Sequence, residues 1–142
     1  MECEFPTINS RSEDIIEIFK NTKTIAIAGL SPDPSKASNM VAAYLQSVGF
    51  KIVPVYPKEE FILGEKVYRT ISEIPFKIDM VDIFRKSDAI AEILDEVIAR
   101  GDVDCVWFQL GLANNEAALK AKEFGMKVVQ NKCTKIEHRN LF

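Results

Sequence analysis

The sequence is poor in histidine and cysteine, and it has no long hydrophobic run. Of its 142 residues one is histidine and three are cysteine, and Cys3, Cys105 and Cys133 lie far apart. An odd number of scattered cysteines predicts neither a disulfide framework nor a paired-cysteine metal site. The apolar runs are much shorter than the roughly 20 residues that a membrane span needs, and no leader of basic and apolar residues opens the chain. We therefore expect a soluble cytoplasmic protein without a metal.

Positive charge is also scarce. The chain has 18 lysines and arginines against 21 aspartates and glutamates, which gives a net charge of -3. Nucleic acids and anionic membranes are bound through extended basic surfaces, so neither is expected as the main partner. A few local lysines could still bind a small anion. The length fits one domain with one sizeable core.

Short apolar runs alternate with segments of helical periodicity along the chain. The runs typical of buried parallel strands are 24–28, 51–55, 80–84, 104–108 and 127–129. Helical spacing of apolar residues follows Ser38, Ser87 and Asn114, each of which can cap a helix, and a glycine ends each helical segment, at positions 49, 101 and 125. This alternation predicts an α/β fold, a Rossmann-like, doubly wound and mainly parallel sheet with helices on both faces.

The domain boundaries follow from the same pattern. We expect a single domain over 1–142, with an N-terminal helix extension over 1–23, a core over 24–137 and a tail over 138–142. The amphipathic segment 12–20 is the expected extra helix. Between 58 and 78 the pattern weakens, and we expect a loop, a short strand near Val67 and one helical turn at 72–74.

The loop after the first strand has part of what a diphosphate site needs. Ligands of doubly wound sheets bind beyond the carboxyl ends of the strands, where a dinucleotide fingerprint has three glycines. Here only Gly29 is present, and two prolines remove amide donors. The serine hydroxyls of the loop, Lys36 and the first amides of the helix at Ser38 remain, and this set can hold a diphosphate. Alternatively, Gly29 only permits a tight turn and Ser38 only caps a helix.

Lysine replaces the acidic residue that NAD-binding domains usually carry after the second strand. The segment there is Tyr56-Pro57-Lys58. A lysine at this point favours a ribose that bears a phosphate, as in NADP or coenzyme A (CoA). Arg85 and Lys86, after the third main strand, add positive charge to the same rim. The alternative for each is a solvated surface cation.

Five motifs occur in order over 24–137 and make a family resemblance specific. They are Gly29-x-Ser31, Val53-Pro54-Val55-x-Pro57, Val81-Asp82-Ile83-Phe84-Arg85, Trp107-Phe108-Gln109-Leu110-Gly111 and Val128-Val129-Gln130-Asn131-Lys132-Cys133. With them the chain resembles the small stand-alone CoA-binding proteins. That family is similar to the N-terminal domain of the succinyl-CoA synthetase alpha subunit.

The resemblance implies a CoA or acyl-CoA ligand that runs along all the loops at this edge. The first loop would hold the diphosphate, the second the adenosine with its 3′-phosphate at Lys58, the third would border the ligand, and the fourth would lie toward the pantetheine arm. The implied cofactor-binding residues are Gly29, Ser31, Lys36, Ser38, Asn39, Val55, Pro57, Lys58, Phe84, Arg85, Lys86, Gln109, Leu110, Gly111 and Cys133.

No set of residues predicts catalysis by the chain alone. His138 lies in the charged tail, where a solvated role is the usual one, and Asp79 and Asp82 flank a strand without an obvious base or nucleophile. We therefore expect a non-catalytic CoA-binding protein. The alternatives are an NADP-type dinucleotide-binding protein, or an interaction or regulatory subunit of an acyl-CoA enzyme. A protein partner or a homo-oligomer is compatible with each.

Cys133 is the one candidate for a reactive thiol. It follows the last strand beside Lys132, and a nearby cation favours the thiolate form that reacts. A mixed disulfide with the CoA thiol is then chemically available. The alternative is a small residue that packs the turn. Cys105 lies in an expected buried strand and should be inert.

Overall fold

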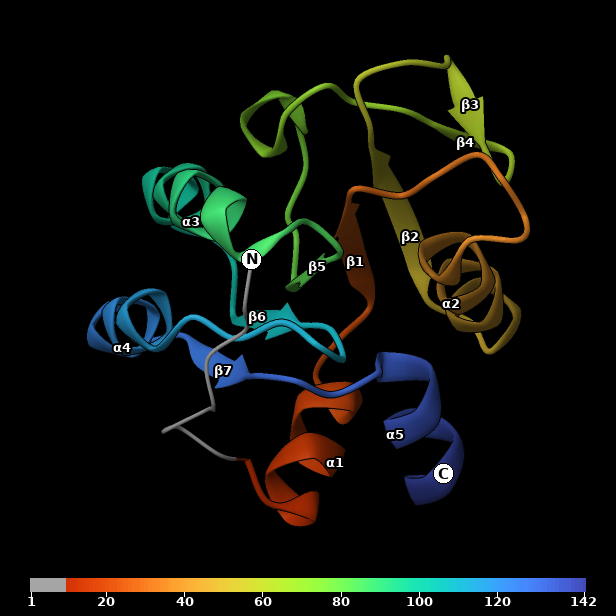
Figure 1. Ribbon diagram of the computed structural model, residues 1–142. Helices are drawn as coiled ribbons and strands as arrows, with labels where there is room; N and C mark the ends of the chain where they lie inside the picture. The colour runs from red at the N-terminus through yellow and green to blue at the C-terminus, as the bar shows by residue number, and fades with distance from the viewer. Residues whose placement is uncertain (1–9) are drawn as a thin grey trace.

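The computed structural model describes residues 10–142 and has three layers, with helices on both faces of a sheet (Figure 1). Cys3 lies outside the described residues. The helices and strands are α1 (Ser12–Lys20), β1 (Thr24–Ala28), α2 (Ala37–Ser47), β2 (Lys51–Val55), β3 (Phe61–Ile62), β4 (Glu65–Lys66), the 3-10 turn η1 (Ile71–Glu73), β5 (Met80–Ile83), α3 (Ser87–Arg100), β6 (Cys105–Phe108), α4 (Asn115–Glu123), β7 (Lys127–Val129) and α5 (Thr134–Leu141).

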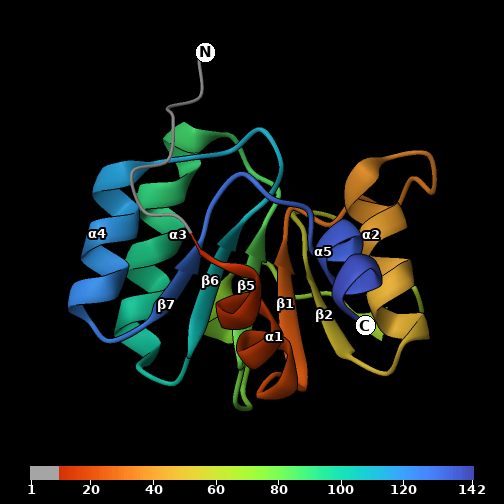
Figure 2. The same cartoon turned by 90° about the horizontal axis from the view of Figure 1, so that it is seen from below.

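The main sheet has five parallel strands in the order β2-β1-β5-β6-β7 (Figure 2). Ala28, the last residue of β1, pairs with Val55 at the end of β2 and with Ile83 at the end of β5. The carboxyl ends of the strands therefore lie along one edge. From β1 the chain moves outward to β2 and then returns to the other side of β1 with β5, so the order reverses between β1 and β5. This is the position where doubly wound sheets bind ligands.

Two apolar cores lie on opposite faces of the sheet. The helices α3 and α4 cover one face, and α1, α2 and α5 cover the other. Trp107 and Phe108, both fully buried neighbours on β6, belong to different cores because successive side chains of a strand point to opposite faces. Most strand residues are buried, as expected for a parallel sheet covered on both faces.

The structure confirms the predicted fold and most of the element positions. The strands β1, β2 and β7 and the helix α1 have the predicted bounds, and the three glycines after the helices have positive φ. The segment 58–78, where the sequence pattern is weak, folds as a short antiparallel hairpin followed by η1. The two strands of the hairpin, β3 and β4, have two residues each. Tyr68 then forms a single β-bridge to Val55. This bridge places Arg69, the residue after Tyr68, at the end of β2.

The C-terminal end of the chain differs from the expected tail with a solvated His138. Residues 134–141 form α5, and His138 is half-buried there. Its Nδ1 lies 2.8 Å from the Tyr44 hydroxyl, and its ring stacks on Phe142 and meets the edge of Phe19. Burial lowers the pKa of His138. The histidine thus joins α5 to α1 and α2.

Arg100 fixes the segment between η1 and β5 to the end of α3. Its guanidinium donates hydrogen bonds to the carbonyls of Ile71, Ile74 and Phe76 at 2.6–3.1 Å and to the Asp102 carboxylate at 2.9 Å. Only 11% of the arginine side chain is exposed, so these acceptors have little access to water. The pairing with Arg100 also lowers the pKa of Asp102, against a rise from burial.

Arg100→Ala should lower the free energy of unfolding by about 2–4 kcal/mol, because it leaves several partly buried acceptors without a donor. Urea unfolding of the variant against the unmodified protein measures this. The control is Arg139→Ala, an exposed arginine of α5, for which a change within about 0.5 kcal/mol is expected. Equal losses in the two variants would contradict the structural role of Arg100.

Candidate functional site

The loop after β1 is folded by hydrogen bonds among its own residues. The Ser31 amide donates to the Ser38 hydroxyl at 3.0 Å, and the Asn39 side chain donates to the Ser31 carbonyl at 2.9 Å. Ser38 and Asn39 are buried. These contacts hold the loop against the first turn of α2.

The start of α2 differs from the expectation. The helix begins at Ala37 with Lys36 in the N-cap position, and no side chain caps it, so Ser38 is not the cap that the sequence suggested. Its hydroxyl is used to bind the loop instead. The first turn of α2 contains no acidic residue. Helix N-termini carry open amides and a partial positive charge, so this one is electrostatically suited to an anion.

Asp33 brings a negative charge to the same loop. The Ser35 amide and hydroxyl donate to its Oδ1 at 2.9 Å and 2.8 Å, and these bonds lower the pKa of Asp33. The Ser35 hydroxyl is therefore committed to the loop. The three serines that the sequence offered for a phosphate, Ser31, Ser35 and Ser38, all have hydroxyl partners within the loop, since the Ser31 hydroxyl accepts from the Asp33 amide at 3.1 Å.

Gly29 stands at the point where the strand order reverses. Its amide donates to the Val55 carbonyl at 2.9 Å, and its φ is +88°. A Cβ atom here would lie 2.9 Å from Cδ of Arg85, so the arginine crosses directly over the glycine. The positive φ favours glycine at this position, and the absence of a side chain leaves room for Arg85.

A small pocket of about 90 Å³ opens beside Gly29, and we call it the arginine pocket. It is lined by Ala28, Gly29, Val55, Tyr56, Pro57, Arg69, Ile71, Arg85 and Ile93. Four of these are predicted site residues. Arg69 is new: its Nη1 donates to the carbonyls of Tyr56 at 3.0 Å and Lys58 at 2.8 Å. Sequence analysis missed Arg69 because only the bridge of Tyr68 to Val55 brings it to this edge.

A second, largely apolar pocket of about 340 Å³ lies beside α5, and we call it the α5 pocket. It is lined by Ala37, Val41, Phe84, Gln109, Leu110, Leu112, Cys133 and Ile136. Again four are predicted site residues. Cys133 is half-buried in the N-cap position of α5, and Leu110 is 65% exposed at the rim.

The remaining predicted residues line neither pocket. Lys36, Lys58 and Lys86 are exposed on the loops after β1, β2 and β5. Gly111 lies in the turn after β6, where its amide donates to the Asn131 side chain at 2.7 Å. The predicted set thus shares one edge of the sheet, but the structure divides it between two pockets, the loop after β1 and exposed positions on the rim.

A buried carboxyl group lies directly behind the α5 pocket. Asp82 is fully buried inside β5, where its Oδ1 accepts from Nε2 of Gln109 at 2.6 Å and its Oδ2 accepts from the Thr134 hydroxyl at 2.9 Å. Nε2 of Gln109 also donates to the Thr134 hydroxyl at 2.8 Å. Burial raises the pKa of Asp82 to about 7, although the two hydrogen bonds oppose the rise. Asp82 therefore titrates near neutral pH.

Asp79 has a structural role at the opposite edge of the sheet. Its Oδ2 accepts from the amides of Lys23 and Thr24 at 2.9 Å, and Lys77 lies 3.2 Å from its Oδ1. These hydrogen bonds lower the pKa of Asp79, although burial opposes them. The expectation that both aspartates flank the third main strand is wrong for Asp82, which lies inside β5, whereas Asp79 directly precedes the strand.

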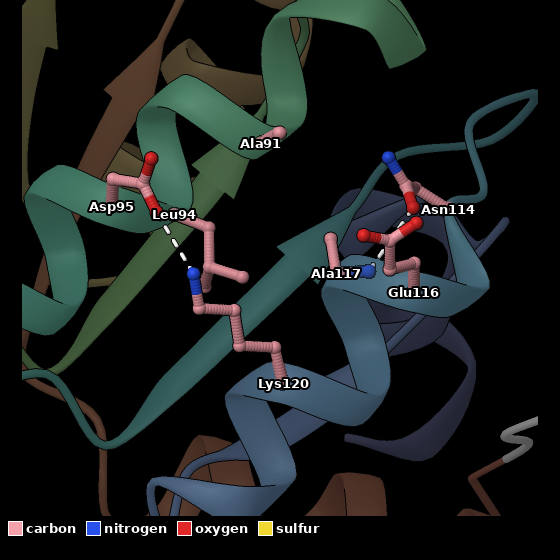
Figure 3. Close-up of a pocket in the computed structure, with 7 residues that line it drawn as sticks. All are labelled: Ala91, Leu94, Asp95, Asn114, Glu116, Ala117 and Lys120. Carbon is pink, nitrogen blue, oxygen red and sulfur yellow. Dashed lines mark hydrogen bonds and ion pairs between the residues drawn. The ribbon is translucent and has the colours of Figure 1, made fainter.

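Another pocket, of about 170 Å³, lies between α3 and α4 (Figure 3). Lys120 reaches across it to Asp95 at 3.1 Å, and the Asn114 side chain accepts from the Ala117 amide at 3.0 Å as the cap of α4. None of the predicted site residues lines this pocket. Within residues 10–142, no cluster of three or more histidine, cysteine or acidic side chains could hold a metal ion. No helix in this described part is both long and apolar enough to cross a membrane.

A family model described as a CoA binding domain matches residues 23–139. Over 130 residues the chain is 36% identical to the uncharacterised protein YneT of Bacillus subtilis, covering 92% of this chain and 96% of that one. It is 29% identical over 139 residues to the alpha subunit of the ADP-forming acetate–CoA ligase II of Pyrococcus furiosus, covering 89% of this chain. The match spans only 30% of that subunit's length.

A solved structure of a hypothetical protein from Pyrococcus horikoshii OT3 superimposes with a TM-score of 0.90. The two chains are 40% identical, and the superposition covers 99% of each. The whole three-layer arrangement is therefore shared with this neighbour.

Gly29→Ala should displace Arg85, because the new Cβ would occupy the position next to its Cδ. Gly125→Ala is the matched control, since Gly125 has a similar φ of +84° and no atom lies within 4 Å of the point that a Cβ would occupy there. Both variants should lose about 1–2 kcal/mol of unfolding free energy from backbone strain. Only Gly29→Ala should shift the ¹H–¹⁵N resonance of Arg85 Nε, and an unshifted resonance would contradict the contact.

Asp82→Asn should alter the dependence of stability on pH. Because the pKa of Asp82 is raised from its ordinary 3.8 to about 7 in the folded state, its contribution to stability is full below pH 4 and is lost as pH rises to 7. Asparagine keeps a similar shape and does not titrate. Between pH 5 and 8 the native protein should lose on the order of 2 kcal/mol relative to the variant in chemical denaturation. Parallel curves would show that Asp82 does not titrate in this range.

Proposed function

The chain belongs to the family of CoA binding domains, and on that premise we propose that it binds CoA or an acyl-CoA at the carboxyl edge of its sheet. The observation that carries the proposal is the arginine pocket. Arg69 and Arg85 line it at the point where the strand order reverses, next to the exposed Lys58. Guanidinium groups bind phosphate through paired hydrogen bonds, and CoA carries three phosphates.

The adenosine end of the ligand is proposed to lie at the arginine pocket. Tyr56 and Pro57 supply apolar surface for the base, while Arg69 and Lys58 supply positive charge for the 3′-phosphate. Arg69 is held by the carbonyls of Tyr56 and Lys58, so its guanidinium is already oriented when the ligand arrives. An oriented donor loses less conformational entropy on binding.

The diphosphate is proposed to lie beside Arg85, which crosses Gly29, and the start of α2. Arg85 supplies a cation there, and the uncapped first turn of α2 favours negative charge. Lys36 adds a cation at the N-cap position. The pantetheine arm would then reach the α5 pocket, whose largely apolar lining suits such an arm.

We propose binding without a reaction carried out by this chain alone. His138 is committed to Tyr44, and Asp82 is enclosed by Gln109 and Thr134. The activity of the Pyrococcus furiosus ligase belongs to a protein of which the matched region makes up only 30% of one subunit. A role as a subunit or regulator of an acyl-CoA enzyme is compatible with the proposed binding.

Isothermal titration with CoA, dephospho-CoA, NADP and NAD tests the proposal, on protein freed of copurified ligand by refolding. CoA should bind in the micromolar range, and loss of the 3′-phosphate should weaken binding about tenfold, the effect of one charge-assisted hydrogen bond. Lys58→Ala and Arg69→Ala should weaken CoA by a similar factor and leave dephospho-CoA unchanged.

The matched control is Lys127→Ala, an exposed lysine at the opposite edge of the sheet, for which CoA affinity should not change. Tighter binding of NADP than of CoA would favour the dinucleotide alternative. Absence of binding by all four compounds would refute the proposed function.

A further inference from the structure

One polar atom of the α5 pocket has no partner in the protein. Both N–H groups of the Gln109 amide are used, by Asp82 and Thr134, and no residue of the described chain hydrogen-bonds its Oε1. Only 4% of Gln109 is exposed, yet no fully buried side-chain nitrogen or oxygen in residues 10–142 lacks a partner. Oε1 must therefore reach solvent, and the opening that Gln109 lines is the α5 pocket.

The hydrogen bonds behind the pocket form a closed ring when Asp82 is ionised. Gln109 supplies two donors and Thr134 supplies one, and the acceptors are the two oxygens of Asp82 and the Thr134 hydroxyl. Each donor has one acceptor. This count leaves Oε1 of Gln109 as the only part of the side-chain amide that is available to a ligand.

Reversal of the Gln109 amide is blocked by the carboxylate. A flipped amide would place Oε1 at the 2.6 Å position now held by Nε2, where two acceptor oxygens would face each other. Protonation of Asp82 removes the block, because its O–H can donate to Oε1. The Thr134 hydroxyl keeps its hydrogen bond to Oδ2 of Asp82. In the present orientation the added proton leaves one hydrogen of the ring without an acceptor, whereas the flipped amide gives each hydrogen of the ring an acceptor. The NH2 group then faces the pocket.

We propose that Asp82 is a positioning residue that sets the hydrogen-bonding character of the α5 pocket through Gln109. With Asp82 ionised, the pocket presents only an acceptor, which suits a ligand that brings an amide N–H. With Asp82 protonated, the flipped amide presents a donor instead. The identity of the ligand rests on the proposed function, in which the pantetheine arm of CoA supplies the amide N–H.

The titratable and charged groups around Asp82, outside the ring with Gln109 and Thr134, do not share its proton. On β6 the Cys105 thiol is the titratable neighbour, and burial together with Asp82 raises its pKa far above neutrality, so it stays uncharged. The residues of β1 and α1 that face this core are apolar. On α5, His138 is turned to Tyr44 of α2. No charged side chain contributes to the pKa of Asp82.

The ligand-free protein provides the first test, through the side-chain ¹H–¹⁵N resonances of Gln109 between pH 5.5 and 8.5. In the native protein they should follow one titration with a midpoint near the pKa of Asp82, about 7. Asp82→Asn should abolish it. Thr134→Val should move the midpoint upward, because it removes a hydrogen bond that stabilises the carboxylate, a response that a purely structural role would not give. Resonances that do not titrate, or that titrate equally in Asp82→Asn, would overturn the proposal.

The second test is the affinity for CoA at pH 6 and pH 8, measured by titration calorimetry. The native protein should lose about three- to tenfold more affinity at pH 6 than Asp82→Asn does, the value of one neutral hydrogen bond. The CoA phosphates titrate equally in both measurements. The comparison with Asp82→Asn therefore removes their contribution to the pH dependence of the affinity. Asp95→Asn, at an exposed ion pair, should keep the native profile.

The two tests separate the two proposals. Equal pH dependence in the native protein and Asp82→Asn would overturn the positioning role. Failure of every form of the protein to bind CoA would refute the proposed function, while the Gln109 resonances would still decide whether Asp82 controls the amide.

Discussion

The register of the central strands is the constraint on which the rest of the structure depends. Because β1 pairs in parallel with both β2 and β5, and Ala28 faces the last residue of each, three loops must leave the sheet at the same height. Gly29, the turn at Tyr56 and Arg85 become neighbours for that reason alone. A shift of one residue in either pairing would turn the buried side chains of a strand to the other face, so the two cores hold the register in place.

The interior of the sheet is apolar except at one place. A carboxyl group with no cation beside it is an unfavourable occupant of a protein core, and hydrogen bonds from Gln109 and Thr134 offset only part of that cost. The ring also joins the end of β6 to the first turn of α5. It lies directly behind Gln109, which lines the α5 pocket, so the least favourable group of the core is one hydrogen bond away from that proposed ligand site.

Local patterns were enough to predict the fold and most of the candidate edge. Alternating apolar runs, helical spacing and the glycines after helices predicted the main strands and four of the five helices. Helix α5 was missed because its sequence is charged, and its stability comes from contacts of His138 with Tyr44 and Phe19, which are far away in sequence. Arg69 was missed for a similar reason, since its position depends on a single bridge across the weak segment. The ring at Asp82 joins three distant segments, and nothing in the neighbouring residues of any one of them indicates it.

The contacts of Arg100 have a consequence for how rigid the proposed ligand site is. Ile71 forms part of the arginine pocket, and its carbonyl is held by Arg100, which is itself paired with Asp102 at the amino edge of the sheet. The long excursion between β2 and β5 is attached to the sheet by the bridge of Tyr68 to Val55 and by the buried side chains of Ile71 and Ile74. Arg100 adds a further attachment from the amino edge, so the wall of the pocket is held from both ends of the sheet.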